Sequence, residues 1–188
     1  MYQIYYYEIL VLITIIWCMA RLWVAKKMKK INWKRELQLI LVYVCIIVVV
    51  RYTFFPFHKL DGQIRPLNFS VTKIIPFKIN LKPFVHMWDY ADKKEAILNL
   101  VGNITMFIPL GIIFPIVYKN LNNHAKVIAV GIGFSVVIEI LQLLCFERTT
   151  DIDDLIMNSS GYIIGYIIYL IVKCIKSKLL RSQKRVCN

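Results

Sequence analysis

One acidic residue, Glu139, stands inside a mostly apolar stretch of the sequence, residues 126–146. A carboxylate at membrane depth costs about 3 kcal/mol even on insertion scales, so such a residue pairs with another group or has a function. Ser135 lies four residues before Glu139 and Gln142 three residues after it, so all three share one face of a helix. The spacing predicts a polar stripe that contains a carboxylate, the side-chain type of general bases and of cation ligands.

Arg51 is the basic residue that the sequence places at the same depth. At about 1.5 Å per residue, Arg51 and Glu139 each lie roughly 20 Å above the inner ends of their apolar segments. Two interpretations follow from this match. In one, the two residues form a buried ion pair that fixes the packing of the helices. In the other, they line an outward-opening pocket for the headgroup of an amphiphile, a role typical of ionisable residues in membranes.

Amides and carboxylates in two more segments are predicted to face the same region. Asn99 and Asn103 are one helical turn apart, and so are Asp154 and Asn158. Asp154 also begins its segment, where a carboxylate can cap the first turn of a helix. The preceding turn adds three charged residues to the candidate site, Arg148, Asp151 and Asp153.

The elements that carry these residues are predicted to be transmembrane helices. Apolar residues make up 59% of the 188 residues, above the roughly 45 to 50% of soluble domains, and the mean hydropathy is +0.60. Each apolar segment is close to the ~20 residues that cross a bilayer. We therefore predict an all-α polytopic membrane protein, a five-helix bundle that forms a single domain over residues 1–188. Its spans are expected at about residues 4–25, 37–57, 96–118, 126–146 and 155–175.

Lysines and arginines predict the orientation of the bundle, because short cytoplasmic connections are enriched in them. Most of these residues fall in the connections 26–36 and 119–126 and in the C-terminal tail from Lys173. The N-terminus is therefore expected outside and the C-terminus in the cytoplasm. The net charge of +13 follows from this topology, and nucleic-acid binding, which needs a folded basic domain, is not expected. Membrane lipids are the expected partners, including anionic headgroups beside the basic inner connections.

One long connection, residues 58–95, lies on the predicted outer side. Its prolines Pro66, Pro76 and Pro83 prevent a long helix. The loop is nevertheless rich in large apolar side chains. Two arrangements are left open: the loop lies on the membrane surface or re-enters the membrane, or it packs as a cap over the helix ends.

Prolines and glycines mark two of the predicted spans. Pro109 and Pro115 predict a kink or an unwound turn in the third span. Gly161 and Gly165, in the spacing GxxxG, predict that a neighbouring helix approaches the fifth span closely. We interpret this motif as internal packing rather than as a dimer contact.

Three ordered stretches of the sequence resemble the VanZ-like family of bacterial membrane proteins. They are NLVGNITMFIPLG at 99–111, SVVIEILQ at 135–142 and RTTDIDDLIMNSSG at 148–161, followed by Gly165. The upstream runs RPLN at 65–68 and IPF at 75–77 resemble a further stretch of the family. The candidate substrate-binding residues are thus Arg51, Arg65, Asn99, Asn103, Glu139, Gln142, Arg148, Asp151, Asp153, Asp154 and Asn158.

The resemblance implies a multi-pass protein of the bacterial cell membrane. The namesake of the family is associated with resistance to glycopeptides, particularly to the lipid-bearing glycopeptide teicoplanin. The resemblance brings no catalytic assignment with it, so it leaves the biochemical mechanism open.

Three functions are compatible with the sequence. The first is a non-enzymatic protein that engages a lipid-linked envelope molecule or a lipoglycopeptide at the outer leaflet and lowers sensitivity to teicoplanin-type drugs; it needs no cofactor. The second is a membrane enzyme that acts on a lipid-linked envelope precursor, in which the carboxylates hold a divalent cation or supply a general base. The third is a small transporter or flippase, to which five spans with no inverted repeat give little support.

Overall fold

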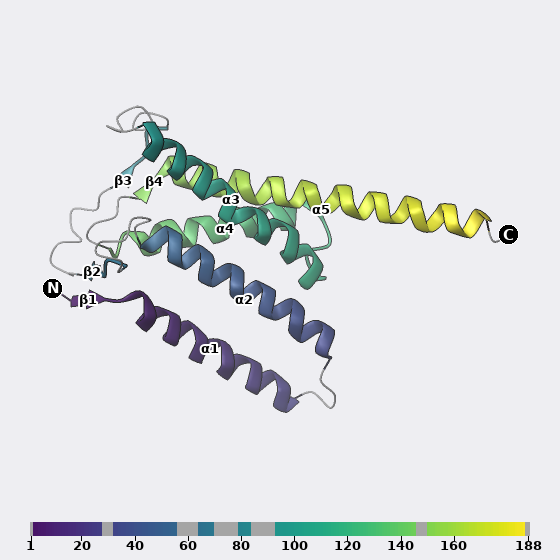
Figure 1. Cartoon of the computed structure of the whole chain (residues 1–188), viewed down its shortest axis with the longest axis horizontal. Coiled ribbons are helices and arrows are strands. Elements are labelled where there is room, and N and C mark those ends of the chain that lie inside the picture. Colours follow the sequence, from purple (N-terminus) through teal and green to yellow (C-terminus); the bar gives the residue numbers. More distant parts are fainter. Residues whose placement is uncertain are drawn as a thin grey trace.

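The apolar segments form five long helices in the computed structural model, which describes residues 2–27, 32–55, 64–69, 79–83, 93–145 and 150–186. Within this part of the chain, all five helices are long and apolar enough to cross a membrane. They run side by side, with the N-terminus at one end of the bundle and the C-terminus at the other (Figure 1). The prediction of an all-α protein with five spans is confirmed, and its orientation stays a prediction. The helices are α1 (Tyr6–Lys27), α2 (Trp33–Phe54), α3 (Lys93–Val117), α4 (His124–Gln142) and α5 (Ile152–Val186).

α5 is longer than the sequence pattern predicts, because it continues as one helix past residue 175 to Val186. The added residues contain no glycine or proline that would end a helix. At about 1.5 Å per residue, its 35 residues span roughly 50 Å, more than the ~30 Å of hydrocarbon in a bilayer. The basic end of α5 therefore projects beyond the other helices, as Figure 1 shows.

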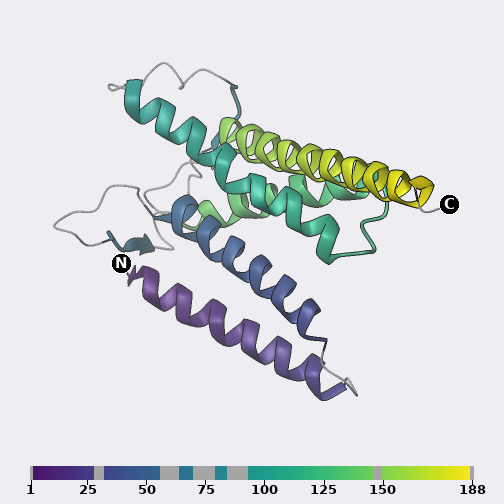
Figure 2. The ribbon, with the colours of Figure 1, turned by 45° about the vertical axis from the view of Figure 1, so that its right-hand side comes forward.

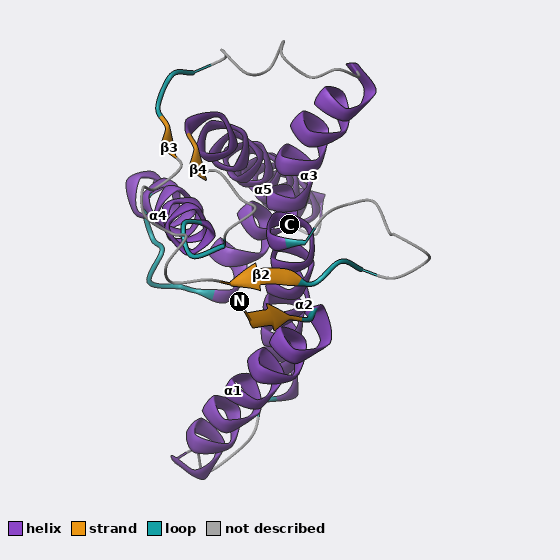
Figure 3. Cartoon of the chain, turned by 90° about the vertical axis from the view of Figure 1, so that its left-hand side faces the viewer, coloured by secondary structure: helices purple, strands orange, loops and turns teal. Residues whose placement is uncertain are grey.

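Two short sheets, which the sequence did not predict, lie at the N-terminal end of the bundle. β1 (Tyr2–Ile4) pairs antiparallel with β2 (Leu67–Phe69), and β3 (Ile79–Asn80) pairs in parallel with β4 (Thr150–Asp151). Figure 3 shows both sheets at the same end of the helices, which we call the strand end. β2 and β3 belong to the long connection, and their pairing with β1 and β4 ties that connection to the N-terminus and to the start of α5. The rest of that connection, including the surface, re-entrant or capping arrangement expected for it, lies outside the described residues.

α5 packs against α3 backbone to backbone. A Cβ atom added at Gly161 would collide with the carbonyl oxygen of Ile104, and one at Gly165 with that of Ile108. A Cβ at Gly111 of α3 would in turn meet the backbone of α5. The close approach predicted from the GxxxG spacing is confirmed, and the partner is a helix of the same chain.

α3 runs as one helix through Pro109 and Pro115. Each proline removes one backbone hydrogen bond, but the contact of Gly111 with α5 holds the backbone between the two prolines. Neighbouring helices commonly make prolines tolerable in transmembrane helices in this way. Of the two alternatives predicted for this span, the unwound turn is therefore wrong, and the kink stays a prediction.

Side chains satisfy several helix ends, where backbone groups have no partner within the helix. Asn32 caps the start of α2 by accepting a hydrogen bond from the backbone N–H of Arg35 (3.2 Å). Asn123 caps the start of α4 in the same way. The Arg35 side chain donates to the carbonyl oxygen of Val117, the last residue of α3. The two asparagine caps explain why α2 and α4 begin a few residues before the predicted spans.

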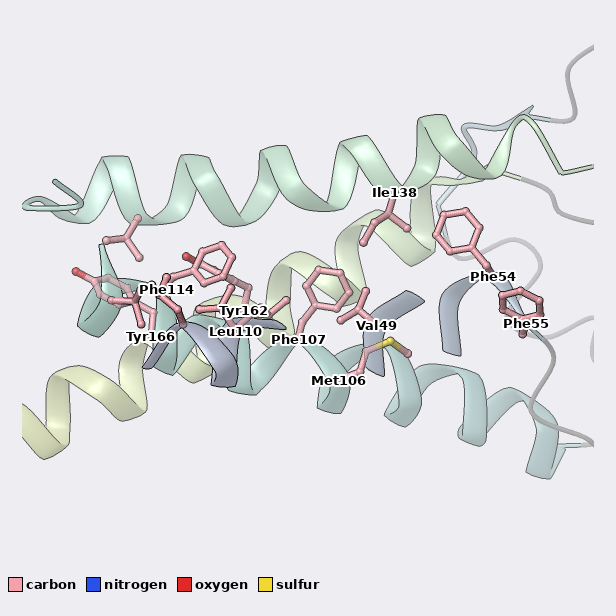
Figure 4. Packing of buried hydrophobic residues seen from close by; sticks show 14 of the residues in the cluster. Val49, Phe54, Phe55, Met106, Phe107, Leu110, Phe114, Ile138, Tyr162 and Tyr166 are labelled. Carbon is pink, nitrogen blue, oxygen red and sulfur yellow. The ribbon is translucent and has the colours of Figure 1, made fainter. Parts of the chain in front are cut away.

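The apolar core lies between α2, α3, α4 and α5. Figure 4 shows Val49 of α2, Phe107 of α3, Ile138 of α4 and Tyr162 of α5 within one interior cluster. All four residues are at most 4% exposed. This apolar cluster is the frame that holds the polar side chains of the same helices in place.

α1 lies at the edge of the bundle beside α2 (Figure 2). None of its residues is buried. A hydrogen bond between Thr14 Oγ1 and the Tyr43 hydroxyl (2.6 Å) and an ion pair between Arg21 and Glu36 join it to α2. α1 therefore adds little to the core that positions the candidate site.

Replacing Gly161 by alanine is expected to lower the free energy of unfolding by about 2 kcal/mol, because the added Cβ pushes α5 away from Ile104. Gly133→Ala is the matched control, since nothing lies within 4 Å of a Cβ at this position of α4. Chemical unfolding of the purified protein in detergent micelles measures both variants. Equal stability of the two variants would contradict the contact between α3 and α5.

Candidate functional site

Glu139 lies on the inner face of α4, where protein atoms cover all but 5% of its surface. Its Oε2 accepts a hydrogen bond from the backbone N–H of Asp151 (3.2 Å), and its carbonyl oxygen accepts one from Thr150 Oγ1 (2.8 Å). The other carboxylate oxygen, Oε1, is buried and has no hydrogen-bond partner among the described residues. Glu139 thus faces the bundle interior, as the sequence predicts, and holds β4 beside the end of α4.

Asp151 anchors the short sheet of β3 and β4 at the strand end. Both of its carboxylate oxygens accept hydrogen bonds from Asn80 Nδ2, at 3.1 and 3.2 Å. Its Oδ1 also accepts one from the backbone N–H of Asp153, at the start of α5 (3.0 Å). Asp151 therefore holds the chain where it enters α5, and Asp153 is itself buried there.

Asn103 and Asp154 link α3 to α5 near Glu139. The Nδ2 of Asn103 donates a hydrogen bond to Oδ1 of Asp154 at 2.5 Å. Asp154 is also close enough to Glu139 to act on it electrostatically. Asn99, one turn before Asn103, is half-buried. The predicted convergence of α3, α4 and α5 at this level is therefore present.

Asn158 lies one turn after Asp154 on α5 and is 1% exposed. Its Oδ1 is buried without a hydrogen-bond partner in the described part of the chain. The side chain is thus sealed inside the bundle, although an apolar residue of similar size would avoid the cost of burying an unpaired amide oxygen.

Gln142 connects the end of α4 to the end of α2. Its Nε2 donates a hydrogen bond to the carbonyl oxygen of Thr53 at 2.8 Å. Thr53 lies in the last turn of α2, where carbonyl groups lack a partner within the helix, so this amide caps α2. Gln142 is 4% exposed, and its Oε1 has no hydrogen-bond partner within the described ranges.

Arg51 does not lie beside Glu139. Its Nη1 donates to the carbonyl oxygen of Phe55 (3.3 Å), and its guanidinium carbon is 5.8 Å from the ring centre of Tyr6 in α1. Arg51 and Glu139, both within the described residues, form no ion pair, which corrects the first interpretation of their matched depth. Depth along a helix gives the level of a residue but not its side. Arg51 lies two residues, or about 200°, from Thr53, whose carbonyl accepts from α4.

A further predicted site residue, Arg65, is not part of the observed cluster. Arg65 is exposed just before β2. Arg148 lies outside the described residues. The observed cluster therefore consists of Asn103, Glu139, Gln142, Asp151, Asp153, Asp154 and Asn158, with Asn99 half-buried nearby.

The carboxylates of the cluster are the side-chain type that binds a divalent cation. Among the described residues, no three histidine, cysteine, aspartate or glutamate side chains come together as a set of metal ligands. His124 lies at the opposite end of the bundle, where its Nδ1 is 2.9 Å from the hydroxyl of Tyr166. The described side chains therefore lend no geometric support to the cation hypothesis.

A family model described as VanZ/LLP1 matches residues 40–173 of this sequence. The chain belongs to the VanZ/LLP1 family. The match runs from α2 into the membrane-spanning part of α5 and excludes α1, the helix that buries no residue. No curated protein and no solved structure matches the chain.

Within this VanZ/LLP1 region, three residues of the observed site were not found from the sequence. Asn80 and Thr150 reach the site through paired strands, and Thr53 contributes only its backbone carbonyl. Short strands of two residues leave no alternation to detect, and a carbonyl carries no sequence signal. These contacts depend on segments that are distant in the chain.

Replacing Gln142 by leucine is expected to lower the free energy of unfolding by about 1 to 3 kcal/mol, because the buried carbonyl of Thr53 loses its donor. Leu141→Ala is the neighbouring control, since Leu141 is 44% exposed on the outer side of α4. Unfolding in detergent micelles measures both. A Gln142→Leu variant as stable as the unmodified protein would show that the cap on α2 is not needed.

Proposed function

We propose that this VanZ/LLP1 protein binds an amphiphilic or lipid-linked molecule of the cell envelope at the strand end of its bundle, and thereby contributes to resistance against teicoplanin-type glycopeptides or to envelope modification. In this proposal it is a multi-pass protein of the bacterial cell membrane. The strand end faces outside, in agreement with the distribution of lysine and arginine in the connections.

The observation that carries this proposal is a set of buried oxygen atoms that lack hydrogen-bond partners among the described residues. They are Glu139 Oε1, Gln142 Oε1 and Asn158 Oδ1, together with the hydroxyl oxygens of Ser135, Ser159 and Tyr162. An unpaired buried polar group costs about 1 to 3 kcal/mol, and buried polar groups in native proteins are nearly always bonded. The headgroup of a bound molecule would supply the missing partners.

The outer surface of α4 supports an amphiphilic ligand rather than a fully polar one. Ile140, Leu141 and Leu144 alternate in sequence with the buried Glu139 and Gln142, and they are 43 to 56% exposed. In a bilayer these side chains contact acyl chains.

Family membership supports the connection to glycopeptides. Teicoplanin combines a polar glycopeptide with a lipid chain, so it has the two parts that this region would contact. A lipid-linked envelope precursor has the same two parts, and the proposal includes both kinds of ligand.

Glu139→Gln is expected to abolish protection of a teicoplanin-sensitive bacterium that expresses the full chain, because an amide nitrogen, which cannot accept a hydrogen bond, replaces one of the two buried carboxylate oxygens. The minimal inhibitory concentration of teicoplanin should fall to that of the empty vector. Glu8→Gln, at an exposed position of α1, is the matched control and should retain protection.

Membrane fractions must contain equal amounts of both variants for this comparison. Full protection by Glu139→Gln at equal abundance would mean that the site is assigned wrongly. Conversion of purified envelope lipids by the isolated protein would instead favour a membrane enzyme over a binding protein.

A further inference from the structure

The contacts between α4 and α5 establish which of their residues share a level. A Cβ added at Gly131 of α4 would meet the ring of Tyr162 of α5. At the strand end, Thr150 and the backbone of Asp151 bond to Glu139. The two helices are therefore antiparallel.

This register places the polar residues in layers. One turn from the level of Gly131 and Tyr162 toward the strand end, Ser135 and Asn158 share a level. One turn further, about 6 Å on, Glu139 shares a level with Asp154.

The atoms that lack partners at these layers are all oxygens. Within the described ranges they are Ser135 Oγ, Glu139 Oε1, Gln142 Oε1, Asn158 Oδ1 and the hydroxyl oxygens of Ser159 and Tyr162. Ser135, Glu139, Gln142 and Asn158 are at most 5% exposed. An ionised glutamate carboxylate and the amide carbonyls only accept hydrogen bonds, whereas the hydroxyls can accept as well as donate. A ligand that satisfies this set must therefore donate hydrogen bonds.

The charges of the surrounding described residues also favour a cationic donor over an anion. Two further carboxyl groups belong to residues beside Glu139: Asp151, whose backbone N–H bonds to Glu139, and Asp154, which accepts from Asn103 at the same level. Arg51, the cation expected beside Glu139, points instead toward Tyr6 of α1. An anionic phosphate at this position would meet like charge and would offer acceptors to acceptors, both of which oppose binding.

We propose that the set formed by Ser135, Glu139, Gln142 and Asn158, termed the acceptor set, binds a primary ammonium group. Such a group carries one positive charge and three N–H donors. This inference rests on the proposed function and assigns the part of the envelope molecule that enters the bundle: its amine and not its phosphate. An amine of an amphiphile and a free amine from solution share this chemistry, and the experiment distinguishes them.

The test measures binding of three single-chain amphiphiles with the same acyl length to the full-length protein in phosphatidylcholine nanodiscs. The probes are dodecylamine, dodecyl phosphate and dodecyl maltoside, each compared with its partition into empty nanodiscs. Dodecylamine is expected to bind at least about tenfold more tightly than dodecyl phosphate. Methylammonium chloride and sodium chloride, added separately, test whether a free cation alone occupies the acceptor set.

Glu139→Gln is expected to weaken dodecylamine binding by at least about tenfold, whereas Glu8→Gln, at an exposed position, leaves it unchanged. Ser135→Ala removes one oxygen with little change of shape and should weaken binding by about fivefold, the effect of one hydrogen bond. The second variant keeps the test valid if Glu139→Gln does not fold.

Equal binding of dodecylamine and dodecyl phosphate would overturn the inference, as would unchanged amine binding by both Glu139→Gln and Ser135→Ala. Methylammonium binding as tight as that of dodecylamine would support the ammonium chemistry and assign a free amine as its source. Occupation by sodium that excludes dodecylamine would overturn the assignment to ammonium. If Glu139→Gln loses drug protection but the protein shows no selectivity for the amine, the proposed function stands and only this inference is overturned. If the protein selects the amine but gives no drug protection, this inference stands and the proposed function is overturned.

Discussion

The arrangement depends on one contact, the close approach of the α3 and α5 backbones at Gly161 and Gly165. Transmembrane helices gain little from excluding water, because lipid is as apolar as their side chains, so close packing holds them together. The contact sets how α5 is placed against α3. Asp154 of α5 can therefore reach Asn103 of α3, and Asn158 is sealed inside the bundle. Residues with side chains at the two glycine positions would separate the helices and disperse the polar cluster.

Polar side chains in this bundle fall into two groups with different physical roles. Gln142 Nε2 and Arg35 satisfy carbonyl groups at the ends of α2 and α3, and Asn103 joins α3 to α5. These atoms stabilise the fold. Glu139 Oε1 and Asn158 Oδ1 have no such partner in the described part of the chain, so packing does not explain them. The two roles can occur within one side chain: Gln142 Nε2 bonds to α2, whereas Gln142 Oε1 has no hydrogen-bond partner among the described residues.

Most of the helices could be predicted because hydropathy and helical spacing act along a single segment. The five spans, the inward face of Glu139 and the packing role of Gly161 are confirmed. The predicted pairing of Arg51 with Glu139 is wrong because the prediction used only the depth of the two residues along their helices. The unwound turn at Pro109, one of two predicted alternatives, is wrong because the neighbouring α5 supports α3 at this point. In both cases the missing information was the rotation or proximity of another helix.

By itself the sequence determined that this is a five-span VanZ/LLP1 protein with a carboxylate on an inward helix face. Hydropathy reflects the free energy of transferring a segment from water into the bilayer, and helical periodicity shows which residues share a face of one helix. Both can therefore be read from the sequence without coordinates. The tertiary structure alone decided that Arg51 faces α1, that β3 and β4 pair, and that Glu139 Oε1 and Asn158 Oδ1 have no hydrogen-bond partner among the described residues. These features depend on how separate helices rotate about their axes and on contacts between distant segments, and no pattern within one segment encodes them.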